Sequence, residues 1–267
     1  MIAFPNAKIN LGLHVIARRS DGYHDIETIF CPIDLCDILE IVSATQTKFI
    51  QSGIPMDCKI SNNLVMKAYQ LLKKHYNLPE ITIHLRKNIP IGAGLGGGSS
   101  DASFMLYLLS NLANLCLSIE ELEAYAKQLG SDCPFFIRNK PVFAKGIGNI
   151  FTPIELDLKK YNLALVTTNI HISTSEAYTN IVVSHTPRES LTDIIHYPVD
   201  KWKNRLVNDF EEDIFPLYPE IREIKQELYN QGAIYASMSG SGSSVYGLFK
   251  KPYRPIGTFN FSIHNFI

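Results

Sequence analysis

Apolar and polar residues alternate strictly near the start of the chain. In NAKINLGLHV (residues 6–15), one face carries Ala, Ile, Leu, Leu and Val, and the other carries Lys8, Asn10, Gly12 and His14. A period of two residues is typical of a β-strand. Strands are predicted by the same reasoning in ITIHLRK (81–87), PVFAKGIGNIF (141–151), YNLALVTT (161–168) and on both sides of the glycines in GAIYASMSGSGSSVYGLF (232–249).

Other segments repeat their apolar residues with the period of a helix. Ser118 and Glu121 form a capping box before one of them, and Pro219 and Gly232 flank the ends of another. This mixture predicts an α+β fold with mixed or antiparallel sheets rather than a doubly wound parallel sheet. We expect two domains, residues 1–155 and 156–267. The predicted helices are NLVMKAYQLLKKHY (63–76), DASFMLYLLSNLANL (101–115), IEELEAYAKQL (119–129) and YPEIREIKQELYNQG (218–232).

The overall composition narrows the classes of partner. The 267 residues are 46% hydrophobic and 19% charged, with a formal net charge of −1. This is typical of a globular protein without the basic field that gathers nucleic acid or an anionic membrane. We expect a small-molecule substrate and no obligate protein partner. The five cysteines lack zinc spacing, and the first residues lack the pattern of a secretory leader, so we expect reduced thiols and a cytoplasmic protein.

The stretch PIGAGLGGGSSDAS (90–103) lies between a predicted strand and a predicted helix. That context excludes a slack linker. Glycines let the backbone approach an anion, and a helix start offers free N–H groups. Asp101 is expected to cap the helix rather than hold a metal. No Gly-Lys-Ser/Thr follows, and the stretch is a poor dinucleotide fingerprint. The pattern alone leaves a phosphate site and an ordinary loop equally open.

This stretch resembles the phosphate loop of the GHMP kinase superfamily, in which the loop wraps the phosphates of ATP. The resemblance implies ATP with Mg²⁺ and a two-domain fold with the active site in the cleft between domains. The residues that it assigns to ATP are Pro90, Ile91, Gly92, Ala93, Gly94, Leu95, Gly96, Gly97, Gly98, Ser99 and Ser100.

Further stretches narrow the resemblance. They are similar to the branch that phosphorylates a cytidine diphosphate ester of methylerythritol in the non-mevalonate isoprenoid pathway. Two alternatives are another kinase of the superfamily, acting on mevalonate, homoserine or a sugar, and a non-catalytic nucleotide-binding relative. One position departs from the family, since Asn149 stands where Glu is usual. The matching stretches are PNAKINLGLHV (5–15), RSDGYHDIET (19–28), LGSDCPFF (129–136), VNDFE (207–211) and SMSGSGSSVYGLF (237–249).

The resemblance makes Asp132 the group that receives the proton of the acceptor hydroxyl. From the sequence alone, Asp132 followed by Cys133 and Pro134 is more often a helix cap. Lys8 alone reads as a lysine on a solvated strand face. The resemblance places its ammonium beside Asp132, where it keeps the base ionised and steadies charge on the acceptor oxygen.

The resemblance also assigns residues to the acceptor. Asn10 is expected to contact a hydroxyl, Tyr23 to stack on the cytosine and His24 to hydrogen-bond it. Thr174 and Tyr178 are expected on the opposite wall, with Tyr178 facing Tyr23 across the base. The alternative is that these are ordinary half-buried or exposed side chains.

Overall fold

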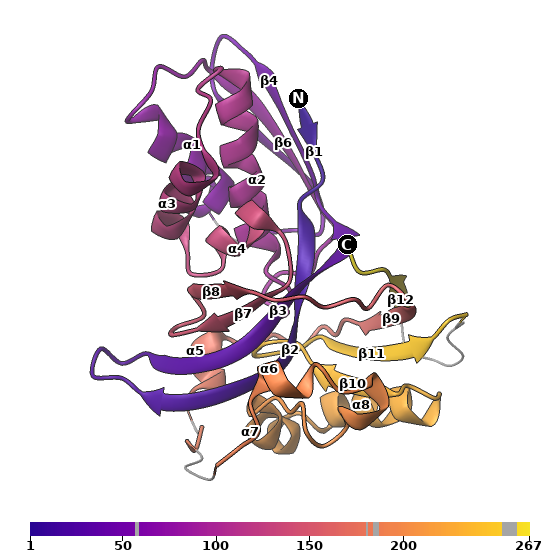
Figure 1. Cartoon of the computed structure of the whole chain (residues 1–267). Coiled ribbons are helices and arrows are strands. Elements are labelled where there is room, and N and C mark those ends of the chain that lie inside the picture. Colours follow the sequence, from indigo (N-terminus) through magenta and orange to yellow (C-terminus); the bar gives the residue numbers. More distant parts are fainter. Residues whose placement is uncertain (57–58, 180, 184–186, 253–260) are drawn as a thin grey trace. The chain divides into compact units, whose positions relative to one another are not determined.

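A computed structural model describes residues 1–56, 59–179, 181–183, 187–252 and 261–267. The chain forms two compact units, each assembled from alternating segments (Figure 1). The first unit contains residues 1–7, 35–91 and 96–140, and the second contains residues 8–34, 92–95 and 141–267.

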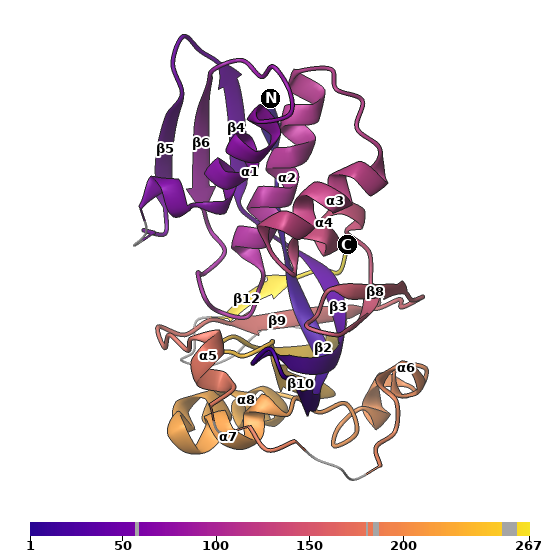
Figure 2. The same cartoon turned by 90° about the vertical axis from the view of Figure 1, so that its left-hand side faces the viewer.

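The first unit is a four-stranded sheet with helices on one face (Figure 2). The strand order is β1-β4-β6-β5, in which β5 runs parallel to β6 and the other pairs are antiparallel. The strands are β1 (Ile2–Ala3), β4 (Ile38–Ser43), β5 (Lys48–Gly53) and β6 (Ile81–Lys87). The helices are α1 (Leu64–Lys73), α2 (Gly97–Leu112), α3 (Ile119–Leu129), α4 (Cys133–Arg138) and the 3-10 turn η1 (Ile60–Asn62).

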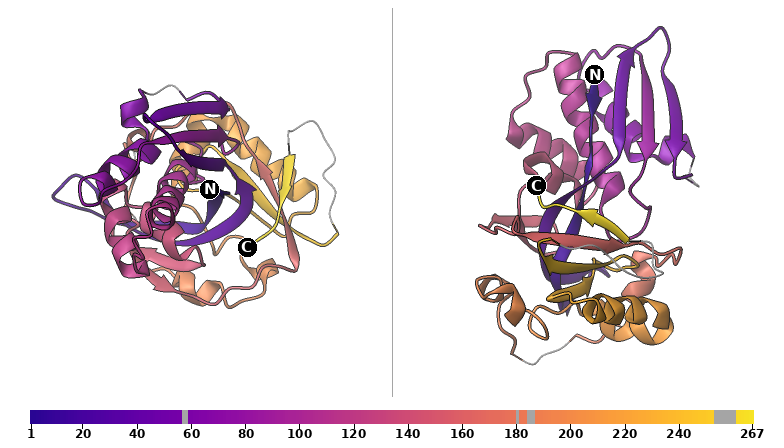
Figure 3. Two further views of the ribbon diagram at one scale, coloured as in Figure 1. Left: turned by 90° about the horizontal axis from the view of Figure 1, so that it is seen from above. Right: turned by 90° about the vertical axis from the view of Figure 1, so that its right-hand side faces the viewer.

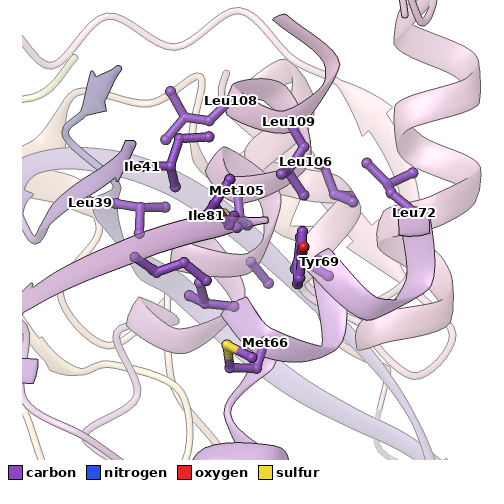
Figure 4. Packing of buried hydrophobic residues seen from close by; sticks show 14 of the residues in the cluster. Leu39, Ile41, Met66, Tyr69, Leu72, Ile81, Met105, Leu106, Leu108 and Leu109 are labelled. Atoms are coloured by element: carbon purple, nitrogen blue, oxygen red, sulfur yellow. The ribbon is translucent and has the colours of Figure 1, made fainter. Parts of the chain in front are cut away.

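One apolar core holds this unit together. Leu39, Ile41 and Ile81 project from the sheet toward Leu72 of α1 and Leu106 of α2 (Figure 4). Burying each such side chain contributes about 1.5–3 kcal/mol relative to leaving it in water. The core therefore fixes α2, whose first turn lies within the glycine stretch (90–103), against the sheet.

The second unit contains two further four-stranded sheets, ordered β2-β3-β7-β8 and β10-β11-β9-β12. All pairs in the second of these are antiparallel. The strands are β2 (Asn6–Arg18, whose first two residues belong to the first unit), β3 (His24–Cys36), β7 (Val142–Lys145), β8 (Ile150–Pro153), β9 (Tyr161–Val166), β10 (Tyr235–Met238), β11 (Val245–Lys250) and β12 (Phe261–His264).

Helix α8 packs on β10 and β11, as Figure 3 shows. Its apolar stripe, Ile221, Ile224 and Leu228, is buried in a core shared with Met238 and Val245. Within the described residues, no helix has both the length and the apolar composition that crossing a membrane requires. The helices of this unit are α5 (Thr174–Ala177), α6 (Leu191–Ile194), α7 (Phe210–Leu217), α8 (Pro219–Asn230) and the 3-10 turn η2 (Val199–Lys201).

The predicted α+β fold is confirmed, and the predicted helices and the other predicted strands are present. The single strand predicted over residues 141–151 is instead the antiparallel pair β7 and β8, because Gly146 and Gly148 form a turn at positive φ. The capping box of Ser118 and Glu121 forms with both of its hydrogen bonds. One further expectation was wrong, and one of the two alternatives for the polar face of β2 is excluded. Helix α2 begins at Gly97, so Asp101 lies inside the helix and does not cap it. The polar face of β2 is buried, although lysine on a strand usually faces water. The division into consecutive domains at residue 155 stays a prediction.

Candidate active site

The glycine stretch has a backbone of alternating handedness. Gly92, Gly94 and Gly96 have φ values of +67°, +75° and +70°. Ala93 and Leu95 between them are not in the left-handed region. Alternation of this kind turns successive N–H groups to one side and forms an anion-binding concavity. Helix α2 starts directly afterwards, and no side chain caps it at Gly96, so its first N–H groups remain available for a phosphate.

Gly94 also packs against the third glycine motif. A Cβ atom placed on Gly94 would lie 1.9 Å from the carbonyl oxygen of Ser239, which no side chain tolerates. The Ser239 hydroxyl donates to the Gly94 carbonyl at 2.9 Å. The two glycine-rich segments are thus in direct backbone contact, and this contact requires glycine at position 94.

Lys8 and Asn10 lie on β2 and are 4% and 2% exposed. The Lys8 ammonium donates to Asn10 Oδ1 at 2.6 Å and to the Gly94 carbonyl at 3.3 Å. It also lies 4.6 Å from the centre of the Phe30 ring. A buried ammonium is retained only where such partners replace water. The structure therefore brings Lys8, Asn10 and the glycine stretch together.

The amide of Asn10 is held at both ends. Its Oδ1 accepts from Lys8, and its Nδ2 donates to Thr28 Oγ1 at 3.0 Å. The backbone carbonyl of Asn10 accepts from the buried Tyr246 hydroxyl at 2.7 Å. Asn10 consequently orients Lys8 in this structure, and its contact with a substrate hydroxyl stays a prediction.

Asp132 stands at the N-cap position of α4, but its carboxylate makes no capping hydrogen bond to the helix. It accepts from Ser131 Oγ at 3.3 Å. The next residue, Cys133, is tied to α2 because Ser103 Oγ donates to its carbonyl at 2.7 Å. Burial raises the pKa of the Cys133 thiol to about 11, so this cysteine is no nucleophile at neutral pH. The capping role that the sequence favoured for Asp132 is absent.

A buried ion cluster lies beneath the start of α2. Lys87 on β6 donates to Asp37 and, at 2.7 Å, to Asp101. Asp37 also accepts from the backbone N–H groups of Asn88 and Ile89, which lead into the glycine stretch. This cluster fixes the residues before the stretch relative to the helix after it. The cluster could not be predicted from the sequence, because its three members are separated by many residues and carry no shared motif.

The aromatic residues assigned to the acceptor are partly brought together. His24 stacks on Tyr178 with ring centres 4.6 Å apart and planes 11° apart. Burial lowers the pKa of His24, and nearby Arg18 lowers it further. Tyr23 is 61% exposed, and Thr174 begins α5 in an exposed position. The structure places His24 against Tyr178, and the predicted facing of Tyr23 and Tyr178 stays a prediction.

The described residues contain no group of three His, Cys, Asp or Glu side chains that could form a metal cage. Mg²⁺ in a kinase needs no such cage, because phosphate oxygens and water supply most of its ligands. Ser100 Oγ, in the first turns of α2, is buried and has no hydrogen-bond partner in the described structure. A hard hydroxyl oxygen at this position fits a phosphate-bound Mg²⁺ or the phosphate itself.

Comparison with known proteins agrees with this geometry. Residues 63–140 match the profile "GHMP kinases N terminal domain", and residues 200–256 match "GHMP kinases C terminal". A relative named 4-diphosphocytidyl-2-C-methyl-D-erythritol kinase, from Parabacteroides distasonis, is 57% identical over 94% of this chain and 93% of its own length. A Porphyromonas gingivalis relative of the same name is 50% identical over 94% and 93%.

Solved structures give the same result. A crystal structure of 4-(cytidine 5'-diphospho)-2C-methyl-D-erythritol kinase superposes with a TM-score of 0.79 at 31% identity, covering 93% of this chain and 90% of the other. A mevalonate kinase superposes at 0.71 with 14% identity, covering 100% and 99%, and shows the fold alone.

The fold and the glycine stretch define an ATP-dependent small-molecule kinase of the GHMP class. Within that class, the chain belongs to the family of 4-diphosphocytidyl-2-C-methyl-D-erythritol kinases.

Proposed function

We propose that this protein transfers the γ-phosphoryl group of ATP to a hydroxyl of 4-diphosphocytidyl-2-C-methyl-D-erythritol, with Mg²⁺ bound to the nucleotide. The observation that carries the proposal is the buried Lys8 ammonium, which donates to Asn10 and to the Gly94 carbonyl of the glycine stretch. The names of the relatives supply the acceptor. We also propose a cytoplasmic location, since none of the described cysteines (Cys31, Cys36, Cys116 and Cys133) forms a disulfide.

The reaction forms one bond and breaks one bond at phosphorus. The acceptor oxygen bonds to the γ-phosphorus while the bond to the bridging oxygen of ADP breaks, and Asp132 takes the hydroxyl proton. Lys8 stabilises negative charge on the transferred group and the acceptor oxygen. N–H groups of the glycine stretch and of the first turn of α2 bind the phosphates.

Mg²⁺, when bound, neutralises phosphate charge, and Ser100 Oγ is the oxygen of this chain that we propose for it. Asp101 is a second choice, because Lys87 engages its Oδ2 while its Oδ1 is buried without a hydrogen-bond partner in the described structure. The chain's own contribution is therefore to hold the nucleotide and to receive the proton.

Selection of the acceptor is proposed to rest on the rings of Tyr23, His24 and Tyr178. Stacking of a base on an aromatic ring contributes about 1–3 kcal/mol. Mevalonate, homoserine and sugars lack a base, so these rings favour a cytidine ester over the alternative acceptors.

The direct test mixes the purified protein with Mg-ATP and a panel of acceptors, and follows ADP release together with the mass of the product. We expect release above background only with 4-diphosphocytidyl-2-C-methyl-D-erythritol. Preferred turnover of mevalonate, homoserine or a sugar would assign a different kinase activity. ATP binding without turnover of any acceptor would favour a non-catalytic relative.

The Asp132→Asn variant tests the proton acceptor. We expect kcat to fall about 10²–10⁴-fold, because general-base assistance contributes that much. The Kd for ATP should change little, and so should the melting temperature, because the carboxylate makes no capping bond. A variant that keeps more than about a third of the normal kcat would contradict the assignment.

A further inference from the structure

The hydroxyl of Ser239 joins two parts of the candidate site. Ser239 follows β10 and is completely buried. Its Oγ accepts from the backbone N–H of Asn10 at 3.2 Å and donates to the carbonyl of Gly94 at 2.9 Å. One side chain thus links the strand that carries Lys8 to the glycine stretch.

The Lys8 ammonium donates to the same two residues. It reaches Asn10 Oδ1 at 2.6 Å and the Gly94 carbonyl at 3.3 Å. The Gly94 oxygen therefore accepts from both Lys8 and Ser239. Any change in the separation of Asn10 and Gly94 moves both acceptors of the ammonium.

Ser239 itself is held firmly. Its N–H donates to the Ser244 carbonyl at 2.9 Å. Asn208, buried on the chain before α7, donates its Nδ2 to the carbonyls of Met238 at 2.9 Å and Gly240 at 2.8 Å, on either side of Ser239. The backbone that carries the hydroxyl is fixed from both sides, which is what a positioning group requires.

We propose that Ser239 is a positioning residue for phosphoryl transfer: its hydroxyl, together with the backbone hydrogen bond from the Lys8 N–H to the Leu95 carbonyl at 3.0 Å, sets the separation of β2 and the glycine stretch and so places the Lys8 ammonium. The inference rests on the proposed function, because Lys8 acts only in that reaction. The hydroxyl exchanges no proton and contacts no reacting atom. Its effect passes through Lys8.

The first test is Ser239→Ala. We expect kcat to fall about 10- to 100-fold, as misplacement of a catalytic group by about 1 Å can cause, with KM for both substrates changed less than about threefold. Ser110→Ala is the matched control. Ser110 is a buried serine late in α2 whose Oγ accepts from the Leu117 N–H, so its loss removes one buried hydrogen bond elsewhere. A purely structural Ser239 would behave like this control, with a lower melting temperature and normal kcat.

The second test repeats Ser239→Ala in a Lys8→Met background. If Ser239 acts through Lys8, the second change lowers kcat by less than about twofold, because coupled residues are not additive. A further tenfold loss would overturn the inference.

The third test needs no turnover. The backbone N–H of Asn10 loses its acceptor in Ser239→Ala. We therefore expect hydrogen exchange at this N–H to be at least about tenfold faster than in the wild type. Unchanged exchange would overturn the inference. A wild-type protein that fails to phosphorylate the acceptor would refute the proposed function alone, since exchange still decides whether Ser239 holds β2.

Discussion

At the scale of single residues, two buried lysines have different surroundings. Lys87 donates to two carboxylates, those of Asp37 and Asp101. Lys8 donates to a side-chain amide and a backbone carbonyl of the candidate site. One ammonium cannot balance two carboxylates. Burial raises the pKa of Asp101 to about 7, Lys87 opposes this rise, and Asp37 adds to it.

This shift predicts a pH-dependent stability. The folded protein holds the Asp101 proton more tightly than the unfolded chain, so the contribution to stability is complete below about pH 4 and is lost as the pH rises through about 7. Asn is a neutral stand-in for the protonated acid. We expect the unfolding free energy of the wild type, relative to Asp101→Asn, to fall by up to about 4 kcal/mol between pH 4 and pH 7.

Denaturant titrations of both proteins across this range give that difference. Titrating groups outside this cluster cancel in the difference, because both proteins share them. If the unfolding free energies of the two proteins change in parallel with pH, the Asp101 carboxyl is already ionised in the folded protein at pH 4. Asp37, Lys87 and Asp101 would then all carry their charges at neutral pH.

Tyr178 is also tested as a single residue. It stacks on His24 and meets Phe210 edge to face at 4.9 Å, so it contacts both a site residue and the core. Tyr178→Phe keeps the ring and should leave the acceptor KM and stability nearly unchanged. Tyr178→Ala should raise the acceptor KM about tenfold or more and leave the ATP KM little changed.

The melting temperature distinguishes a role of Tyr178 in binding the acceptor from a role in core packing. Some loss is expected in Tyr178→Ala because the contact with Phe210 disappears. A large loss of stability with an unshifted acceptor KM would identify Tyr178 as packing only.

At the scale of elements, periodicity predicted β2 and β6 but not the burial of their polar residues. In the sequence, Lys8, Asn10 and Lys87 occupy positions that usually face solvent. Their burial cannot be predicted from the local pattern, because the partners that replace water come from distant segments of the chain. The sequence predicts this helix only from Asp101 onward, and the glycines before it disfavour helix. The backbone nevertheless becomes helical at Gly97, where the tertiary packing leaves no space for a side chain.

The start of α2 gives a prediction of its own. A Cβ on Gly97 would lie 2.8 Å from Ile89 Cγ2 and 3.2 Å from Lys87 Nζ. Gly97→Val should therefore displace the helix start and raise the KM for ATP by about tenfold or more, because a displacement near 1 Å can weaken positioning that far. The acceptor KM should change less.

Gly98→Ala is the steric comparison for melting temperature, since its Cβ would meet only Leu64 at 3.8 Å. We expect it to keep the wild-type melting temperature. A folded Gly97→Val protein with unchanged ATP KM would contradict a phosphate role for this stretch.

The candidate site was predicted unevenly. The glycine stretch, Lys8 and Asp132 could be predicted because each lies in a contiguous motif, and these motifs occur in the same order as in the family that the sequence resembles. Ser239, Thr28 and the cluster of Asp37, Lys87 and Asp101 act through contacts that only the folded chain creates. A polar residue on one face of a predicted strand was the available signal, and it reveals neither the burial of that residue nor its partner.

At the scale of the whole molecule, the fold is shared more widely than the proposed substrate. A mevalonate kinase with 14% identity has the same fold over the whole chain. A shared fold alone therefore does not choose the acceptor, and we propose that a small set of side chains such as Tyr23, His24 and Tyr178 does.

The interleaving of the two units limits how such enzymes can recombine. The second unit contains residues 8–34 and 92–95 as well as 141–267. A gene crossover near residue 155 would join β2 and β3 from one parent to β9, β10 and β11 from the other. Gly94 would then come from one parent and Ser239 from the other, although the two residues are in direct contact. Productive exchange between distant relatives is therefore expected to favour surface loops over halves of the gene.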